Sequence, residues 1–329
     1  MPRALTIIIP TRDRAHLMGG LLDGLKGLRG LKRIQPQIVI AENQSKDQTW
    51  KILQAAAGDF PVPFTAIQLS KSGKSAAINH TVHLAEGKNL AFLDDDVIPD
   101  PGWLEAIERF IDTGTYAVGQ GRIELESPVG EDPEIQKLNQ RFRTIPRLEF
   151  DSSIERLHSL NGANFVICRS ALEQVGLFDD RLGPGASGTS EDVELARRLT
   201  RAGITIGYIP DAIAFHRVDR ARLTENYFKS IHKKQGQSRL VFKDLTVPHI
   251  LFDLCRTAVQ YGIDSLVSEE RRRYRSKGRV YHYLGMLEAK LNGYPENRGD
   301  ARSLANCAND SAVKRVNAPY SAGPPNPKD

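Results

Sequence analysis

Cysteine is scarce in this chain of 329 residues, with three cysteines that lie far apart. Such spacing forms neither a disulfide framework nor a zinc site, so we expect a reducing compartment. Long apolar runs are missing as well. The best candidate, residues 250–267, is interrupted by three charged side chains and does not reach the roughly 20 apolar residues that a membrane span needs. A membrane-spanning protein is therefore not expected.

Other absences exclude further classes of protein. The chain runs from Met1 directly into an apolar stretch without the layout of a signal peptide. No G-x-G-x-x-G pattern follows that stretch, which argues against a nicotinamide enzyme. The formal charge of +5 suits phosphate ligands or an anionic membrane surface, but acids and bases are mixed and no nucleic-acid motif is present. We expect a cytoplasmic protein that is soluble or sits on the surface of a membrane.

Short apolar runs alternate with segments of helical periodicity through the first half of the chain. The runs at 5–9, 37–41, 64–69 and 89–93 have the length and composition of buried strands. Strands that alternate with helices predict an α/β fold with a mainly parallel sheet and helices on both faces. In such sheets the ligand binds beyond the carboxyl ends of the strands, where this chain places polar clusters.

The run at 89–93 ends in three consecutive acids, Asp94, Asp95 and Asp96. Three carboxylates at one sheet edge repel one another unless a counter-charge is present. A divalent cation bound through oxygen atoms is the simplest remedy, and magnesium or manganese usually brings phosphate with it. A solvated acidic turn before Pro99 is the alternative, and these residues alone leave both readings open.

Two further groups have both a structural and a functional interpretation. Ser190 is predicted to cap a helix whose first turn carries Glu191 and Asp192. Acids in that position commonly stabilise the helix dipole, by about 0.3–1 kcal/mol. His216 follows an apolar run, where it is either an ordinary edge histidine or an imidazole that reaches a cation.

The composition changes along the second half of the chain. Residues 127–159 are charged and poorly periodic, which predicts an insertion over the cleft. Residues 218–291 contain basic amphipathic helices that could rest on anionic lipid, although a solvated face is the commoner explanation. Residues 292–329 are rich in Pro, Asn, Gly and Ser and are predicted to be disordered.

Taken in order, several segments resemble glycosyltransferase family 2, whose members are inverting sugar transferases with the GT-A fold. The resemblance spans roughly residues 5–217. It lies in the opening segment 8–14, the strand end 38–47, the segment 73–79 with the DxD motif at 94–96, the acceptor-half segments 162–165 and 176–179, the Glu-Asp motif at 190–195, and the closing segment 210–216.

The resemblance implies a GT-A domain over 1–217, with a nucleotide-binding half at 1–100 and an acceptor half at 101–217. A helical extension at 218–291 and the tail would follow. It also implies single-sugar transfer from a nucleoside-diphosphate sugar, with a uridine diphosphate (UDP) sugar favoured, to a hydroxyl on a glycan or glycolipid. The expected setting is bacterial surface polysaccharide assembly.

Site residues follow from the same resemblance. A manganese or magnesium ion would be held by Asp96, with His216 and Asp94, and would neutralise charge on the leaving group. Asp192, beside Glu191, would take the proton from the acceptor hydroxyl as general base. The residues assigned to the nucleotide sugar are Pro10, Thr11, Asp13, Arg14, Glu42, Asp94 and Asp95, together with Lys74 as a phosphate contact, which is assigned from its charge more than from a motif.

The chain also departs from the family pattern. Glu42 replaces the usual aspartate after the second strand, and Gln235 and Arg239 do not form the Gln-x-x-Arg-Trp motif of processive synthases. Single-sugar transfer is therefore expected. A sugar nucleotidyltransferase and a catalytically inactive sugar-binding relative remain as alternatives. A nucleotidyltransferase would need a glycine-rich basic signature in the loop after the first strand, which this sequence lacks. An inactive relative would be expected to have lost one of the acids Asp94, Asp96 and Asp192, all of which are present.

Overall fold

The computed structural model describes residues 4–70, 73–151, 153–267, 269–294 and 314–317. In these residues ten strands form one sheet in the order β10-β3-β2-β1-β4-β8-β6-β9-β5, and β7 pairs with β9. The strands are β1 (Leu5–Thr11), β2 (Gln37–Asn43), β3 (Phe64–Leu69), β4 (Asn89–Leu93), β5 (Val97–Pro99), β6 (Val118–Leu125), β7 (Arg156–Leu157), β8 (Asn164–Cys168), β9 (Ile206–His216) and β10 (Lys314–Asn317).

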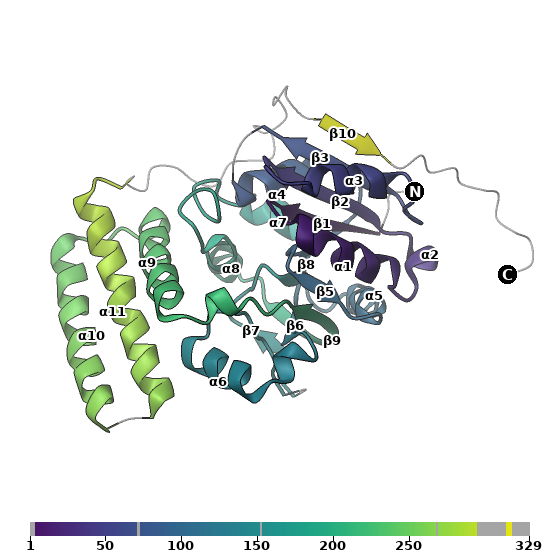
Figure 1. Ribbon diagram of the computed structural model, residues 1–329. Helices are drawn as coiled ribbons and strands as arrows, with labels where there is room; N and C mark the ends of the chain where they lie inside the picture. Colours follow the sequence, from purple (N-terminus) through teal and green to yellow (C-terminus); the bar gives the residue numbers. More distant parts are fainter. Residues whose placement is uncertain (1–3, 71–72, 152, 268, 295–313, 318–329) are drawn as a thin grey trace, which may run out of the picture.

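Helices cover both faces of this sheet (Figure 1). Those of the sheet-bearing part are α1 (Ala15–Lys26), α2 (Leu31–Ile34), α3 (Thr49–Ala57), α4 (Lys74–Leu84), α5 (Trp103–Thr113), α6 (Pro133–Phe142), α7 (Arg169–Val175) and α8 (Glu191–Arg201). Short 3₁₀ turns lie at Val129–Glu131 and Arg220–Arg222. The expected α/β fold with helices on both faces of the sheet is confirmed.

The alternation of side chains along β1 shows how the two apolar layers arise. Ile7 and Ile9 pack with α1, α3 and α5, whereas Ile8 packs with α4, α7 and α8. All seven residues of β1 are buried, because successive side chains of a strand point to opposite faces and both faces are covered.

Strands β1 to β4 are mutually parallel, as β1 pairs with β2 and β4, and β2 with β3. Strand β8 enters antiparallel between β4 and β6, so the second half of the sheet is mixed. The parallel order brings the carboxyl ends of β1, β2 and β4 to one edge, where Thr11 ends β1, Asn43 ends β2 and the three acids follow β4. This edge is the predicted ligand side.

The segment after the acids is more ordered than a loop. Val97–Pro99 forms β5, which pairs antiparallel with β9, so the turn-like composition of this segment conceals a short edge strand. Ser190 is the N-cap residue of α8 as predicted, but its φ of 77° places it in the left-handed region and its side chain makes no capping hydrogen bond. The structure places Glu191 and Asp192 in the first turn of that helix.

Three long helices follow the sheet: α9 (Glu225–Phe242), α10 (Val247–Val267) and α11 (Glu270–Leu291). Figure 1 shows them packed side by side at one end of the molecule. No helix within the described ranges combines the length and apolarity needed to cross a bilayer. The boundary at residue 217 remains a prediction.

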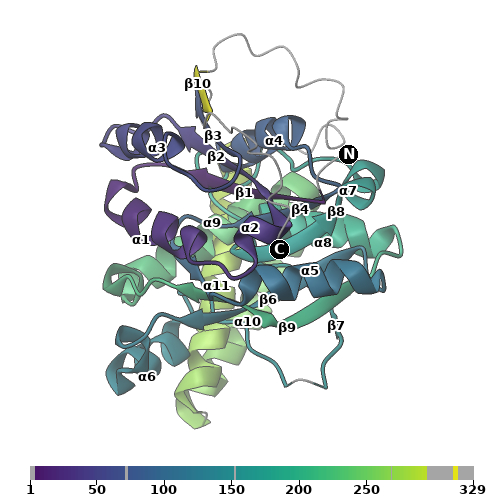
Figure 2. The same cartoon turned by 90° about the vertical axis from the view of Figure 1, so that its right-hand side faces the viewer.

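The predicted disorder of the tail is wrong at one place. Lys314–Asn317 forms β10, which pairs antiparallel with β3 at the edge of the sheet (Figure 2). An alternating segment can satisfy the open hydrogen-bonding groups of an edge strand even where its composition is poor in apolar residues. Residues 295–313 and 318–329, on which the rest of this prediction falls, lie outside the described residues.

Three phenylalanines hold β4 and β8 against the helical layer. The rings of Phe92 and Phe165 stack at a centroid distance of 4.6 Å, and Phe178 packs against both. We predict that Phe92→Ala lowers the free energy of unfolding by about 3–5 kcal/mol. The control Phe150→Ala, at a ring that is 43% exposed, should cost about 1 kcal/mol or less. Chemical denaturation measures both, and equal losses would contradict this account.

Candidate active site

A cavity of about 260 Å³ opens beyond the carboxyl ends of the parallel strands. It lies between the loop after β1, the start of α4, the three acids after β4 and the loop before α8. Its lining residues are Pro10, Thr11, Arg12, Arg14, Asn43, Gly73, Lys74, Asp94, Asp95, Asp96, Pro184, Gly185 and Arg222. Six of the eight residues predicted for the nucleotide sugar therefore share one cavity.

Lys74 connects the two halves of this site. Its Nζ lies 2.6 Å from Asp94 Oδ1 and 3.1 Å from Glu191 Oε1. Burial alone would lower the pKa of Lys74, but the charges of Asp94 and Glu191 raise it well above its ordinary value. The ammonium is thus a fixed positive charge that ties the end of β4 to the start of α8.

Asp96 meets two partners from the end of β9 and the turn after it. Arg222 Nη2 lies 2.7 Å from Asp96 Oδ2, and His216 Nε2 lies 3.4 Å from Asp96 Oδ1. Burial would raise the pKa of Asp96, but His216 and Arg222 hold it below its ordinary value. The carboxylate is therefore ionised and faces a histidine that is 1% exposed.

The hydrogen bond made by Nδ1 of His216 determines whether Nε2 carries a hydrogen or a lone pair. Nδ1 lies 2.8 Å from the carbonyl oxygen of Arg217, which can only accept, so Nδ1 carries a hydrogen. In the neutral imidazole Nε2 is then a lone pair that faces the Asp96 carboxylate. Two acceptors opposite each other require a proton or a cation between them.

This donor pair fits a divalent cation, because an imidazole nitrogen and a carboxylate oxygen are ligands that manganese accepts. Asp94, the other predicted ligand, is paired with Lys74 in the structure, and its role as a ligand stays a prediction. No group of three His, Cys, Asp or Glu side chains in the described part of the chain is arranged to hold a metal. Asp96 and His216 would hold the ion together with oxygen atoms from outside the protein, such as those of a diphosphate.

Asp95 lies between Asp94 and Asp96 in this cluster and is largely buried. Burial, reinforced by the charge of Asp96, raises the pKa of Asp95 to about 7. Arg14, whose Nε lies 3.4 Å from Asp95 Oδ1, opposes the shift. The basic side chains Arg14, Lys74 and Arg222 lie beside these acids in the lining, so the cavity offers carboxylates to a cation and cationic groups to phosphate.

Two of the residues predicted for the nucleotide, Glu42 and Asp13, do not line the cavity. The Glu42 carboxylate accepts from Gln68 Nε2 at 2.8 Å and from the backbone of Ser45. Asp13 accepts at 2.7 Å from the backbone of Lys46. Both acids fasten the loop after β2 in place, so they shape the site through that loop.

Asp192 lies behind the Lys74 cluster. Its Oδ2 accepts from the backbone N–H of Gly162 at 2.9 Å, and its Oδ1 accepts from the N–H of Val193 at 2.7 Å. Burial and the neighbouring charge of Glu191 raise the pKa of Asp192 to about 6. Glu191 is occupied by Lys74, which leaves Asp192 as the better placed proton acceptor of the two.

Six residues that line the cavity were not assigned to a site from the sequence: Arg12, Asn43, Gly73, Pro184, Gly185 and Arg222. Asn43 donates to the carbonyl of Gly73 at 2.7 Å, and its buried Oδ1 has no partner among the described residues. A ligand group could satisfy this acceptor. Arg222 lies beyond the predicted domain, where no local pattern marks it.

Comparisons with curated proteins and solved structures agree with this architecture. The chain is 25% identical over 213 residues to "Glycosyltransferase AglE" of Haloferax volcanii, covering 64% of this chain and 66% of that protein. It is 29% identical over 224 residues to a "Pre-mycofactocin glycosyltransferase" of Mycobacterium tuberculosis, covering 65% of this chain and 43% of that protein. The matches thus span less than two thirds of either relative.

Two solved structures share the fold at low sequence identity. One is "Mannosyltransferase PcManGT from Pyrobaculum calidifontis in complex with GDP-Man and Mn2+", with a TM-score of 0.57 at 15% identity, covering 88% of this chain and 87% of that one. The other is S. aureus TarS 1-349 in complex with UDP-GlcNAc, with a TM-score of 0.54 at 16% identity, covering 88% and 92%. These likenesses concern the fold alone.

The family comparison reaches further, because it rests on the sequence itself. Residues 6–176, more than half of the chain, match the family described as "Glycosyl transferase family 2". This range contains the β1 loop, Lys74 and the three acids of the cavity. The chain belongs to glycosyltransferase family 2.

Proposed function

We propose that this protein is a metal-dependent inverting glycosyltransferase that moves one sugar from a nucleoside-diphosphate sugar to a hydroxyl group. The facing pair of Asp96 and His216 beside the cavity is the observation that supports this most, because it fits a cation that in turn binds diphosphate. We further propose a glycan or glycolipid acceptor in cell-surface polysaccharide assembly. The similar structures carry GDP-mannose and UDP-GlcNAc, so they do not favour one base.

The arrangement supports a direct displacement at the anomeric carbon. Arg14 and Arg222 supply positive charge at the wall where the diphosphate would lie. A divalent cation bound by Asp96 and His216 would neutralise the charge that grows on the departing diphosphate. Asp192 would accept the acceptor's proton, and the Gly162 N–H fixes its carboxylate in position.

Lys74 contributes by position rather than by contact with phosphate alone. It was predicted as a phosphate ligand from its charge, yet two carboxylates already hold its ammonium. We propose that it sets the spacing between Asp94 on the donor side and the start of α8 on the acceptor side. An inactive relative would have no need for Asp94, Asp96 and Asp192 together.

Nucleotide binding tests the donor site directly. We predict that manganese strengthens the binding of one of UDP, GDP, dTDP or CMP by at least about tenfold, and that Asp96→Asn abolishes this gain because the cation loses its carboxylate ligand. Isothermal titration calorimetry measures each nucleotide with and without manganese. The control Asp59→Asn changes an exposed acid outside the cavity and should bind as the wild type.

The outcomes of this titration separate the alternatives. Metal-dependent binding that is lost in Asp96→Asn supports the transferase and identifies the donor base, with UDP as our first expectation. Binding of no nucleotide in either condition would favour the inactive relative. A separate titration with nucleoside triphosphates tests the remaining alternative, since tight binding accompanied by pyrophosphate release would favour a nucleotidyltransferase.

The role of Asp192 has a distinct kinetic signature. We predict that Asp192→Asn lowers kcat by about 10²–10⁴-fold while nucleotide affinity stays near that of the wild type. Since the base must be ionised and the pKa of Asp192 is about 6, log(kcat/KM) of the wild type should fall as pH drops below about 6. Asp112→Asn, on the exposed side of α5, is the control. An unchanged kcat in Asp192→Asn would remove it from the mechanism.

We also propose that the protein works in the cytoplasm at an anionic membrane surface, through α10. This helix exposes large apolar side chains at helical spacing, among them Phe252 (70% exposed), Val259 (64%) and Leu266 (87%). The neighbouring α11 begins with the basic run Arg271 to Arg275. An apolar face flanked by cationic side chains is the arrangement of a helix that lies in a lipid interface.

Vesicle binding tests this proposal. Exchanging Phe252, Val259 and Leu266 together for Gln should weaken binding to phosphatidylglycerol vesicles by at least about tenfold, since each large apolar side chain contributes about 1.5–3 kcal/mol when fully buried. Cosedimentation with phosphatidylglycerol and with phosphatidylcholine vesicles measures the effect, and Phe150→Gln serves as the control. A wild type that binds neither kind of vesicle would refute the proposal.

A further inference from the structure

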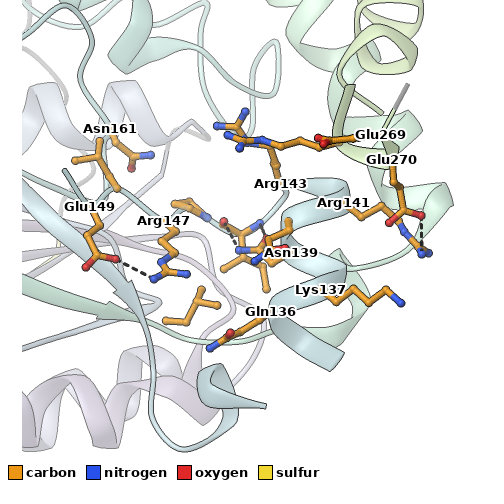
Figure 3. Close-up of a pocket in the computed structure, with 16 residues that line it drawn as sticks. Gln136, Lys137, Asn139, Arg141, Arg143, Arg147, Glu149, Asn161, Glu269 and Glu270 are labelled. Atoms are coloured by element: carbon orange, nitrogen blue, oxygen red, sulfur yellow. Dashed lines mark hydrogen bonds and ion pairs between the residues drawn. The ribbon is translucent and has the colours of Figure 1, made fainter. Parts of the chain in front are cut away.

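A second, larger cavity of about 820 Å³ lies between the 127–159 insertion and the start of α11. Figure 3 shows Asn161 and Glu149 on one side, Glu269 and Glu270 on the other, and α6 between them. Five basic and three acidic side chains line it, which leaves it net positive. They are Lys137, Arg141, Arg143, Arg147 and Arg271, and Glu149, Glu269 and Glu270.

The cavity has a fixed framework even though much of it belongs to an insertion. Asn139 on α6 accepts from the backbone of Ile145 and donates to its carbonyl, at 3.1 and 3.2 Å. Leu148 forms a two-hydrogen-bond bridge with Ile123 of β6. An apolar cluster that includes Phe142 and Ile145 packs against α9 and α11. The insertion is therefore built into the structure.

The arginines of this cavity differ in whether a carboxylate of the protein already pairs with them. Arg141 pairs with Glu270 at 2.8 Å, and Arg147 pairs with Glu149 at 2.8 Å. Arg143 and Arg271 make no ion pair with any carboxylate in the described part of the chain. The Nε of Arg141 is buried and also has no partner there. Arg143 and Arg271 are both exposed to solvent, so their guanidinium groups are accessible to an anion from solution, and the planar fork of such a group matches phosphate in particular.

Two connections link this cavity to the candidate active site. Asn161 lines the cavity, and the next residue, Gly162, donates its N–H to Asp192. Thr144, which lies between two lining residues, donates to the carbonyl of Arg222 at 2.6 Å, and Arg222 pairs with Asp96. The second cavity is thus joined to Asp192 through Gly162 and to Asp96 through Arg222.

We infer that this arginine-lined cavity binds a phosphate group of the acceptor, so that the preferred acceptors are phosphate-bearing molecules whose hydroxyl reaches Asp192. The inference rests on the proposed glycosyl transfer, and it names the acceptor class for that reaction. The phosphate contributes only to binding of the acceptor and takes no part in the displacement. It could belong to a free sugar phosphate or to a lipid.

The test compares wild type with the double variant Arg143→Gln/Arg271→Gln in the full chain. Inorganic phosphate, glucose 1-phosphate and monomeric dihexanoyl phosphatidic acid are titrated calorimetrically, each in the presence of manganese. Removing two charge-assisted contacts should weaken the binding of the phosphate probes by at least about tenfold. Preference for glucose 1-phosphate would indicate a free acceptor, and preference for the short-chain lipid would indicate a lipid-linked one.

Two controls localise the effect. Arg201→Gln removes an exposed arginine at the end of α8, away from the cavity, and should bind the probes as the wild type does. Nucleotide titrations of the double variant should match the wild type, and thermal melts should show that it is folded. Phosphate binding that is absent in the wild type, or unchanged in the double variant, would overturn the inference. A chain that binds no nucleotide but loses phosphate binding in the double variant would instead refute the proposed donor reaction alone.

Discussion

The buried ammonium of Lys74 is the interaction on which the rest of the site depends. It lies against Asp94 at the end of β4 and Glu191 at the start of α8, two elements that come from different halves of the chain. Without it, two carboxylates would be left in a poorly solvated place, at a cost that usually exceeds the value of the pair itself. Lys74 therefore fixes the distance between the end of β4 and the start of α8.

The position of Lys74 also helps to explain why the acids of the site differ in their pKa values. Asp94 and Glu191 share the ammonium of Lys74, and Asp96 is ionised beside Arg222, so each of these three acids has a basic partner. Asp95 and Asp192 carry the raised pKa values, about 7 and about 6. Groups that titrate near neutrality within one site are the ones that can respond to a cation or exchange a proton.

Much of this arrangement could be predicted from the sequence, because parallel strands bring their carboxyl ends to one edge. Pro10 and Asp94 are far apart in the chain, yet the alternation of strands and helices indicates that they meet, whereas Lys74 was assigned mainly from its charge. The prediction for Glu42 did not hold in detail, since a strand-end acid can turn inward and fasten the next loop instead of facing the ligand. Periodicity gives a residue's place along a strand, but it does not give the partner that its side chain selects.

Arg222 and the order of the 127–159 insertion could not be predicted from the sequence, for a different reason. Arg222 lies in a short 3₁₀ turn after β9, and its pairing with Asp96 depends on how that turn crosses the sheet edge. The 127–159 insertion showed no clear period, although it contains the ten-residue helix α6. Its order comes from Phe142 and Ile145 packing against the distant helices α9 and α11. Contacts of this kind are long-range in sequence and leave no local signal.

The insertion and the helical extension therefore have to be understood together. Each supplies part of one cavity, since Arg143 comes from the end of α6 and Arg271 from the first turn of α11. The cavity requires both segments, because the insertion forms one side of it and the start of α11 forms the other. The extension also carries the exposed apolar face of α10. If that face rests on lipid, the arginine-lined cavity next to it is held near the membrane surface, where a phosphate-bearing acceptor anchored in the bilayer could enter it.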